Sequence, residues 1–507
     1  MKLIRLIFRR MFFLALMVIL EIGLLVGLCL WFGSRIAWFE RVLQILGLIL
    51  VLFIIKRSRH LSMDVIWILL ILLLPVPGTI LYLFLAADLF ISRTYQELIR
   101  SAAYSRQFFG KEEGVLEELE ALNPDMKGQF RYLENAEHYP FYRNTGFDYY
   151  PLGDEGYPIL LEDLKKAEKF IFMEYFIIEE GVMWDGILEI LEEKAKEGID
   201  VRVMYDDIGS FFTLSYKYAR ELEARGIKCV PFNRINPIIG AILNHRDHRK
   251  ITVIDGKVAF SGGVNLADEY INVKVKYGHW KDNMIRITGK AVWSYTVLFL
   301  SHWNALHPED TDYTKFKCDD PLPGVRDGFI CPYGETPLDK EITSQTVYEE
   351  ILYQSSDYCY IMTPYLIIDT ELENALILAA KQEVDVRIIT PGIPDKKLIW
   401  QITKSYYRQL IEGGVKIYEY TPGFVHSKVF VSDDKAAAVG TINLDYRSLY
   451  LHFENGTYLY GSEKVLDVKK DFLETLNQCH EVTLEESKNG LVSELFMALL
   501  RVAAPML

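Results

Sequence analysis

Two segments of this chain carry the same five kinds of residue in the same order. The first segment has His248, Lys250, Asp255, Gly262 and Asn265. The second segment has His426, Lys428, Asp433, Gly440 and Asn443, each 178 positions further along the chain. A single His-x-Lys pair on a strand is weak evidence of function. Repetition of the whole set indicates that the two copies work together.

Two histidines and two lysines that meet between similar halves would form a pocket for one tetrahedral anion. One imidazole can attack phosphorus while the other, when protonated, gives its proton to the leaving alcohol. The lysines, with Asn265 and Asn443, would hold the non-bridging oxygens, a role otherwise often given to metal ions. Asp255 and Asp433 would each fix the tautomer of a histidine, in the same half or in the other.

The alternative interpretation of each motif is structural. Alternation along a strand puts His248 and Lys250 on one face, Asp255-Gly256 is a good hairpin turn, and Gly262 can relieve crowding. A hairpin needs neither histidine nor lysine, however, and partly buried charges are costly unless they are paired or used. Two matching copies therefore favour catalysis.

Alternating strand and helix patterns surround both motifs. In the first half we expect a helix over 185–197 and strands at 169–176, 200–203 and 227–232. In the second half we expect a helix over 371–381 and strands at 358–362, 385–388 and 415–420. The predicted fold class is therefore α/β, with two pseudo-symmetric αβα domains, each a mixed sheet flanked by helices.

Composition shifts set the expected domain boundaries. The two α/β domains are placed at 145–307 and 338–485, joined by a Pro- and Gly-rich connector at 308–337. A polar linker, 92–144, precedes them. An amphipathic tail, 486–507, follows them and is expected to dock on the domain rather than on the membrane.

Residues 1–91 form a strongly apolar region. We expect three transmembrane helices there, at 11–33, 36–55 and 65–90, because each stretch is long enough to cross a bilayer core of about 30 Å. Pro75, Pro77 and Gly78 interrupt the third stretch, which allows either a kinked span or a re-entrant hairpin.

The basic residues near these stretches suggest an orientation in the cell membrane. The basic N-terminus and the cluster Lys56, Arg57 and Arg59 belong in the cytoplasm by the positive-inside rule. Three crossings would then place the catalytic part outside the cell. Arg93, Arg100 and Arg106, which follow the third stretch, and the five cysteines of the catalytic part argue against this side.

Charge and cysteine content exclude two classes of protein. The 507 residues include 69 acidic and 55 basic ones, giving a net charge of -14, which is a poor fit to a nucleic-acid binder. The six cysteines are scattered and no pair has two-residue spacing. This argues against a zinc site and against a disulfide scaffold.

The doubled motif resembles the phospholipase D superfamily: HxKx4D, then six residues, then G-[GT]-x-N. The wider context is similar to bacterial cardiolipin synthases. The supporting segments are Met173-Glu174-Tyr175-Phe176, Asn244–Tyr270, Trp280-Lys281-Asp282, Thr363-Pro364-Tyr365, Gly423–His426, Asn443–Ser448 and Phe453-Glu454. Two departures, Gln382-Glu383 and Asp433-Asp434, leave the catalytic residue types unchanged.

The resemblance implies an enzyme that transfers a phosphatidyl group from one phosphatidylglycerol to another and releases glycerol. It implies a covalent phosphatidyl-histidine and no metal or cofactor, with phosphatidylglycerol and membrane lipids as partners. It also implies that His248 is the nucleophile and His426 the acid and base, although the near-equivalent halves leave the reverse order open. Hydrolysis by water and transfer to another alcohol are the alternatives. A non-catalytic membrane scaffold is disfavoured by the two intact motifs.

A few residues near the motifs have two interpretations each. Arg246 and Arg249 would either steer an anionic head group or form surface ion pairs. His245 is expected to be hydrogen-bonded rather than a metal ligand. Glu454 would either orient a lysine or asparagine or be a strand-edge carboxylate.

Overall fold

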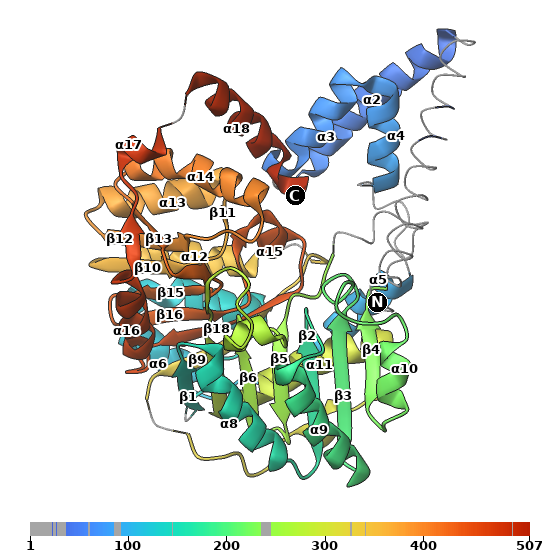
Figure 1. The fold of residues 1–507 in the computed structure, drawn as a ribbon, viewed down its shortest axis with the longest axis vertical. Coiled ribbons are helices and arrows are strands. Elements are labelled where there is room, and N and C mark those ends of the chain that lie inside the picture. Colours follow the sequence, from blue (N-terminus) through green and yellow to red (C-terminus); the bar gives the residue numbers. More distant parts are fainter. Residues whose placement is uncertain are drawn as a thin grey trace.

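A computed structural model of the chain shows two α/β halves and a group of helices that leads into them (Figure 1). The residues that the structure describes are Gly23, Gly27, 37–58, 61–85, 93–143, 145–234, 245–324, 327–339, 341–488 and 490–506. The α/β fold class predicted from the sequence is confirmed.

The first half contains a seven-stranded mixed sheet in the order β1-β8-β6-β5-β2-β3-β4. Its strands are β1 (Thr145–Tyr150), β2 (Phe170–Tyr175), β3 (Asp200–Asp206), β4 (Lys228–Phe232), β5 (Lys250–Ile254), β6 (Val258–Gly262) and β8 (Met284–Gly289). The parallel strands β2, β3 and β4 adjoin the antiparallel hairpin β5–β6. The helices of this half are α8 (Gly153–Lys165), α9 (Val182–Lys196), α10 (Tyr218–Glu223) and α11 (Val292–Leu306).

The second half contains an eight-stranded mixed sheet in the order β19-β13-β12-β10-β15-β16-β18-β9. Its strands are β9 (Phe329–Glu335), β10 (Tyr358–Met362), β12 (Asp385–Pro391), β13 (Lys416–Tyr420), β15 (Val429–Ser432), β16 (Ala436–Gly440), β18 (Glu454–Tyr460) and β19 (Cys479–Glu481). Its helices are α12 (Thr343–Gln354), α13 (Thr370–Lys381), α14 (Lys397–Glu412), α15 (Tyr446–Tyr450), α16 (Val465–Leu476) and α17 (Leu484–Ser487). Apart from β19, each strand has a counterpart in the first sheet, so the predicted internal repeat is confirmed.

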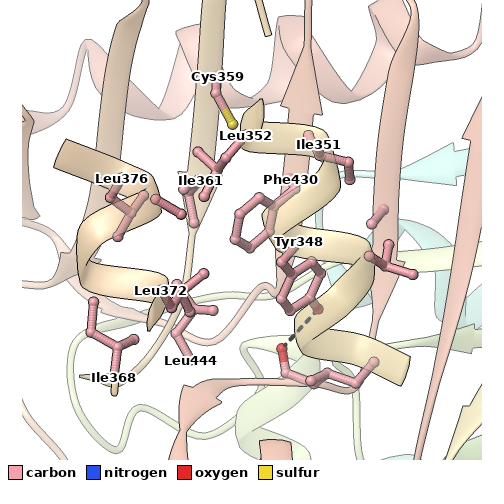
Figure 2. Packing of buried hydrophobic residues seen from close by; sticks show 14 of the residues in the cluster. Tyr348, Ile351, Leu352, Cys359, Ile361, Ile368, Leu372, Leu376, Phe430 and Leu444 are labelled. Atoms are coloured by element: carbon pink, nitrogen blue, oxygen red, sulfur yellow. Dashed lines mark hydrogen bonds between the residues drawn. The ribbon is translucent and has the colours of Figure 1, made fainter. Parts of the chain in front are cut away.

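The core of the second half shows why these elements form. Strand β10 is buried along its whole length, as expected for an apolar run covered on both faces. Helix α12 covers one face of the sheet, where Tyr348 stacks on Phe430 with ring centroids 4.1 Å apart (Figure 2). The Tyr348 hydroxyl donates a hydrogen bond to the carbonyl of Ile442 at 3.3 Å.

The two halves share a contiguous apolar core. Ile251 and Val253 of the first sheet belong to the same buried cluster as Val429 and Val431 of the second. Such a shared core fixes the position of one half relative to the other. The two motifs are therefore held in a defined mutual geometry.

Two predicted boundaries differ from the structure. Strand β9 lies inside the predicted connector 308–337, yet it pairs with β18 and belongs to the second sheet.

The predicted linker 92–144 contains helices α5 (Arg93–Ser105), α6 (Val115–Leu122) and α7 (Lys127–Arg131). Helix α5 is anchored to α11 because the Ser101 hydroxyl donates to the Ser301 carbonyl at 2.6 Å. The sequence did not predict these helices because the composition of residues 92–144 is charged and rich in turn-forming residues.

The tail docks on the second half, as expected. Helix α18 (Leu491–Ala503) lies against α14, where the Arg501 guanidinium sits 3.8 Å from the centroid of the Tyr406 ring. Arg408 of α14 forms an ion pair with Glu494 of α18 at 2.6 Å.

The expected transmembrane helices need correction. Within the part of the chain that the structure describes, no helix is both long enough and apolar enough for a membrane crossing. Helix α2 (Ala37–Arg57) overlaps the predicted span 36–55, but Glu40, Arg41 and Lys56 shorten its uncharged stretch to about 21 Å. The predicted span 11–33 lies outside the described residues except for Gly23 and Gly27.

The predicted span 65–90 is not a single helix. Helices α3 (Leu61–Leu73) and α4 (Pro75–Leu85) fold back on each other, and Trp67 meets Tyr82 with ring centroids 5.8 Å apart (Figure 1). A Cβ at position 78 would collide with the carbonyl of Leu70, so this close approach requires glycine. The two helices therefore form a hairpin rather than a kinked span, and re-entry of this hairpin into a membrane stays a prediction.

Candidate active site

The backbone N–H and the Nδ1 atom of His248 both bond to residues of the second half. Its backbone N–H donates to the carbonyl of Phe453 at 2.9 Å, and its Nδ1 lies 2.9 Å from Oε2 of Glu454. The side chain is buried just before strand β5. Because the carboxylate accepts the Nδ1 proton, Nε2 keeps a free lone pair for attack on an electrophile.

His426 has the reciprocal arrangement. Its backbone N–H donates to the carbonyl of Lys281 at 2.7 Å, and its Nδ1 lies 2.6 Å from Oδ2 of Asp282. Strands β14 (Gly423–Val425) and β7 (His279–Lys281), one from each half, pair in parallel beside it. Each histidine is therefore oriented by a carboxylate of the opposite half, so neither half contains a complete site.

The predicted role of the motif aspartates is wrong. The Asp255 carboxylate accepts hydrogen bonds from the backbone N–H groups of Glu168, Lys169 and Phe170 at 2.7–2.8 Å. It lies at the end of β5 remote from His248. Asp433 accepts three equivalent bonds from the backbone of residues 356–358. Both aspartates fix the hairpin turn to a neighbouring strand, and Asp282 and Glu454 orient the histidines.

This assignment predicts that Asp255→Asn reduces stability far more than catalysis. An amide offers one acceptor oxygen instead of two, so a backbone N–H loses its partner at a cost of about 1–3 kcal/mol. We expect the melting temperature to fall by about 1–3 °C, because unfolding of 507 residues carries an entropy of about 1 kcal/mol/K, and kcat per folded molecule to stay within about tenfold of the parent. Thermal unfolding and vesicle turnover of the same preparation test this. A loss of kcat as large as that of a histidine variant, with unchanged melting, would contradict it.

The two motif lysines lie inside the site. Nζ of Lys250 donates to the carbonyl of His248 at 2.7 Å, and Nζ of Lys428 lies 2.8 Å from Nδ1 of His426. Burial lowers the pKa of Lys250 to about 8 and that of Lys428 to about 7. The charge of Lys250 also lowers the pKa of His426, which shows that the two motifs act on one another electrostatically.

Burial also keeps both imidazoles neutral at pH 7. It lowers the pKa of His248 to about 3, against the opposing effect of Glu454. It lowers the pKa of His426 to about 4, against the opposing effect of Asp282. Burial alone would raise the pKa of Glu454, but His248, His452 and Lys250 together outweigh burial and hold that pKa below its usual range. The resting site thus contains two neutral imidazoles that face anionic carboxylates.

The motif asparagines orient loops near the site. Oδ1 of Asn265 accepts the backbone N–H of Ile177 at 3.0 Å, and its Nδ2 donates to the Tyr270 hydroxyl at 2.8 Å. Nδ2 of Asn443 lies 3.1 Å from Oδ2 of Asp445. Contact of Asn265 and Asn443 with a phosphate therefore stays a prediction.

His452 is a site residue that sequence analysis missed. Its ring lies 5.7 Å from that of His248, and its Nδ1 is 3.7 Å from Oε1 of Glu454. Trp280 takes the corresponding place beside His426, with rings 5.6 Å apart. The likeness between Trp280-Lys281-Asp282 and His452-Phe453-Glu454 was the available signal. The His248 side of the site is therefore more polar than the His426 side.

The flanking basic residues have structural roles. Arg246 is buried and donates to the carbonyl of Asn233 at 2.8 Å. Arg249 is buried and donates to the carbonyl of Leu298 at 3.2 Å. Nδ1 of His245 lies 3.0 Å from the carbonyl of Leu451, as expected for a hydrogen-bonded side chain. Arg246 also pairs with Asp206 at 3.5 Å, so the expected ion pair is present for this arginine, but it is buried rather than at the surface. Burial of both arginines does not match the expected steering of a head group.

Among the residues that the structure describes, two groups of side chains have a metal-like donor set. The donor atoms of His248, His452 and Glu454 lie within 4.8 Å of one another, and so do those of Glu174, Asp247 and His302. In the second group, burial and Asp247 raise the pKa of Glu174, so the two carboxyls can share a proton. Arg249 supplies the balancing positive charge, which disfavours an additional cation.

Comparison with known proteins agrees with this geometry. A family model described as "Cardiolipin synthase, PLD-like domain" matches residues 160–303 and 348–476. The cardiolipin synthase of Halalkalibacterium halodurans is 31% identical over 93% of this chain and 94% of that protein. Cardiolipin synthase 2 of Bacillus anthracis is 32% identical over 90% and 88%. An uncharacterized protein of Streptococcus mutans is 44% identical over 90% and 99%.

A solved structure shows the same fold. The phosphatidylserine synthase of Haemophilus influenzae superposes with a TM-score of 0.58 at 17% identity, covering 75% of this chain and 98% of that one. The family match spans both halves that contribute to the site, and the resemblance inferred from the doubled motif is confirmed. The chain belongs to the family of phospholipase D-like cardiolipin synthases.

Proposed function

We propose that this protein is a cardiolipin synthase, transferring a phosphatidyl group from one phosphatidylglycerol to another and releasing glycerol. The family supports phosphatidyl transfer, and its named members suggest the substrate. The observation that carries the proposal is the reciprocal arrangement of His248 with Glu454 and His426 with Asp282. It supplies two oriented imidazoles for one phosphorus atom.

In the first step, Nε2 of His248 attacks phosphorus and the bond from phosphorus to the glycerol oxygen breaks. His426 gives its proton to that oxygen. Although burial keeps His426 neutral in the resting site, the bound phosphodiester carries a negative charge that favours the imidazolium. Lys250 and Lys428, with Asn265 and Asn443, hold the non-bridging oxygens.

In the second step, neutral His426 takes the proton from a glycerol hydroxyl of the second phosphatidylglycerol. The hydroxyl oxygen attacks phosphorus, and the bond from phosphorus to His248 breaks. Glu454 stabilises the charge that forms on His248 in each step. His426 ends the second step as the imidazolium that began the first, and it gives that proton to solvent when the product leaves and the neutral resting site returns.

The test is turnover in vesicles of phosphatidylglycerol with a chelator present. We expect cardiolipin and free glycerol in equal amounts. If phosphatidic acid is the main product, the enzyme hydrolyses phosphatidylglycerol and does not make cardiolipin. If the phosphatidyl group is transferred to a different added alcohol and no cardiolipin forms, that alcohol is the acceptor.

The lowered lysine pKa values predict an alkaline limit to substrate capture. The positive charge on Lys428 and Lys250 is present below pH 7 and is lost as pH rises through their pKa values of about 7 and 8. We expect kcat/KM, which reports the free enzyme, to fall above about pH 7–8. The limit in kcat should lie at higher pH, because bound phosphate stabilises the lysine charge. A kcat/KM that is flat to pH 10 would count against phosphate capture by these lysines.

A further inference from the structure

We propose that three loops beside the two histidines form a surface that inserts into an anionic lipid bilayer. The inference rests on the proposed function in one respect, since it explains how a lipid head group reaches the site. The loops are residues 207–217 after β3, 271–278 before β7, and 392–396, with the first turn of α14, after β12. We call them the rim loops.

The rim loops lie at the end of the sheets that holds the catalytic histidines. In loop 207–217, Gly209 approaches the carbonyl of Phe176, and the Phe176 ring lies 4.9 Å from that of His248. Loop 271–278 runs directly into β7, which is followed by Asp282, the partner of His426. In loop 392–396, Asp395 accepts a hydrogen bond from Tyr365 at 2.6 Å.

Two of the loops meet each other. A Cβ at Gly278 would lie 3.0 Å from Cδ1 of Ile393, so loop 271–278 touches the loop that leaves β12. Because β3 and β12 hold equivalent places in the two sheets, the surface draws on both halves. The rim loops therefore flank the site from both sides.

Each rim loop exposes apolar side chains that stable folding does not require. Val275 is 81% exposed, Phe212 56% and Leu398 41%, and Tyr216, Val273 and Ile393 are exposed as well. Large apolar side chains gathered around a binding site mark an interaction surface. Single exposed leucines or valines elsewhere on a protein surface need no such explanation.

Lysines accompany these apolar side chains in each loop. Exposed lysines are Lys217, Lys274, Lys276, Lys396 and Lys397. Lys274 and Lys276 pair with Glu179 and Glu269, whereas Lys217, Lys396 and Lys397 form no ion pair with the residues that the structure describes. These five lysines outnumber the two acidic residues of the rim loops, Asp207 and Asp395, and in a chain of net charge -14 this local excess of lysine complements an anionic surface. Apolar tips among lysines suit an anionic bilayer, which attracts basic groups and accepts apolar ones.

A spin label reports directly on the environment of a rim loop. The full chain is reconstituted into phosphatidylglycerol vesicles with Val275→Cys or, as matched control, Leu122→Cys, and the signal of the labelled parent is subtracted. Leu122 is 59% exposed on α6 and lies near Gly461, at the end of β18 remote from Glu454. We expect the label at 275 to collide with oxygen and to be shielded from a water-soluble nickel complex. The label at 122 should show the opposite.

Two results would overturn the proposal. One is free access of the nickel complex to the label at 275. The other is shielding of that label from both reagents, which would place a protein partner or a second copy on the rim loops. The measurement does not depend on turnover, so it decides the surface even if the protein makes no cardiolipin.

Activity provides the second readout. We expect Val275→Asp and Leu398→Asp to lower turnover on phosphatidylglycerol vesicles at least tenfold. On short-chain phosphatidylglycerol dissolved as monomers, turnover should change less than threefold, and Leu122→Asp should change neither rate. An equal loss on both substrates, or on neither, would contradict bilayer insertion.

Discussion

His248→Ala and His426→Ala should each lower kcat on phosphatidylglycerol vesicles by about 10³-fold or more. In the proposed mechanism, one change removes the atom that bonds to phosphorus, and the other removes the group that moves the proton. The double variant should be hardly slower than either single variant, because the two imidazoles act on one phosphorus atom. Release of radioactive glycerol from labelled vesicles measures all three rates.

The control for these variants must show that the protein still folds. Both imidazoles are buried, so alanine removes some packing along with the chemistry. His248→Gln and His426→Gln retain more volume and a polar group, and they should melt within a few degrees of the parent yet remain inactive. If either glutamine variant works at a tenth of the parent rate or faster, that histidine has no part in the reaction.

Glu454→Gln and Asp282→Asn should each lower kcat by about 10²-fold or more, with the larger effect on kcat rather than on KM. Each amide still accepts a hydrogen bond, but it lacks the negative charge that stabilises an imidazolium in the opposite half. The proposed mechanism assigns substrate binding to Lys250 and Lys428, so KM should change only a few-fold. Steady-state kinetics on vesicles of varied phosphatidylglycerol content separates the two constants.

The matched control for these amides is Asp433→Asn. Asp433 carries the motif position in the second half but bonds only to the backbone of residues 356–358 in the structure. Loss of the Asp433 carboxylate should lower thermal stability and leave kcat close to that of the parent. If Asp433→Asn lowers kcat more than Glu454→Gln does, the assignment of the orienting carboxylates is incorrect.

Local patterns were sufficient to predict most of the α/β fold. Apolar runs such as Tyr358–Met362 and Asp385–Ile388 matched β10 and the start of β12 because strand identity depends on neighbouring residues. The fixed offset between His248 and His426 indicated the repeat. Strand β9 was missed because its Pro332 and Gly334 read as connector residues, although pairing with β18 overrides that preference.

The partners of the histidines could not be predicted from spacing. Glu454 lies 206 residues from His248, and Asp282 lies 144 residues from His426. Only the packing of one half against the other brings them together, and the nearby Asp255 and Asp433 were the natural but incorrect choice. His452 was missed for the same reason. It lies close to Glu454, but only the nearby His248 identifies it as a site residue.

For the helices before the first sheet, the sequence predicted features that the structure does not show. Hydropathy alone predicted a crossing at 65–90, but the turn between α3 and α4 depends on Gly78 meeting the backbone of Leu70. A sequence window averages over such a contact. The charges at both ends of α2 likewise count little in an average, yet they set the length of its apolar stretch.

The most direct measurement of the shared site is a rapid-quench experiment with labelled phosphatidylglycerol, mixed in excess with enzyme and stopped within one turnover. Two halves that build one site should release one glycerol per chain in the burst and leave one phosphatidyl label per chain, mapped to either His248 or His426. Two labels per chain, or steady turnover with no label on any histidine, would contradict the account.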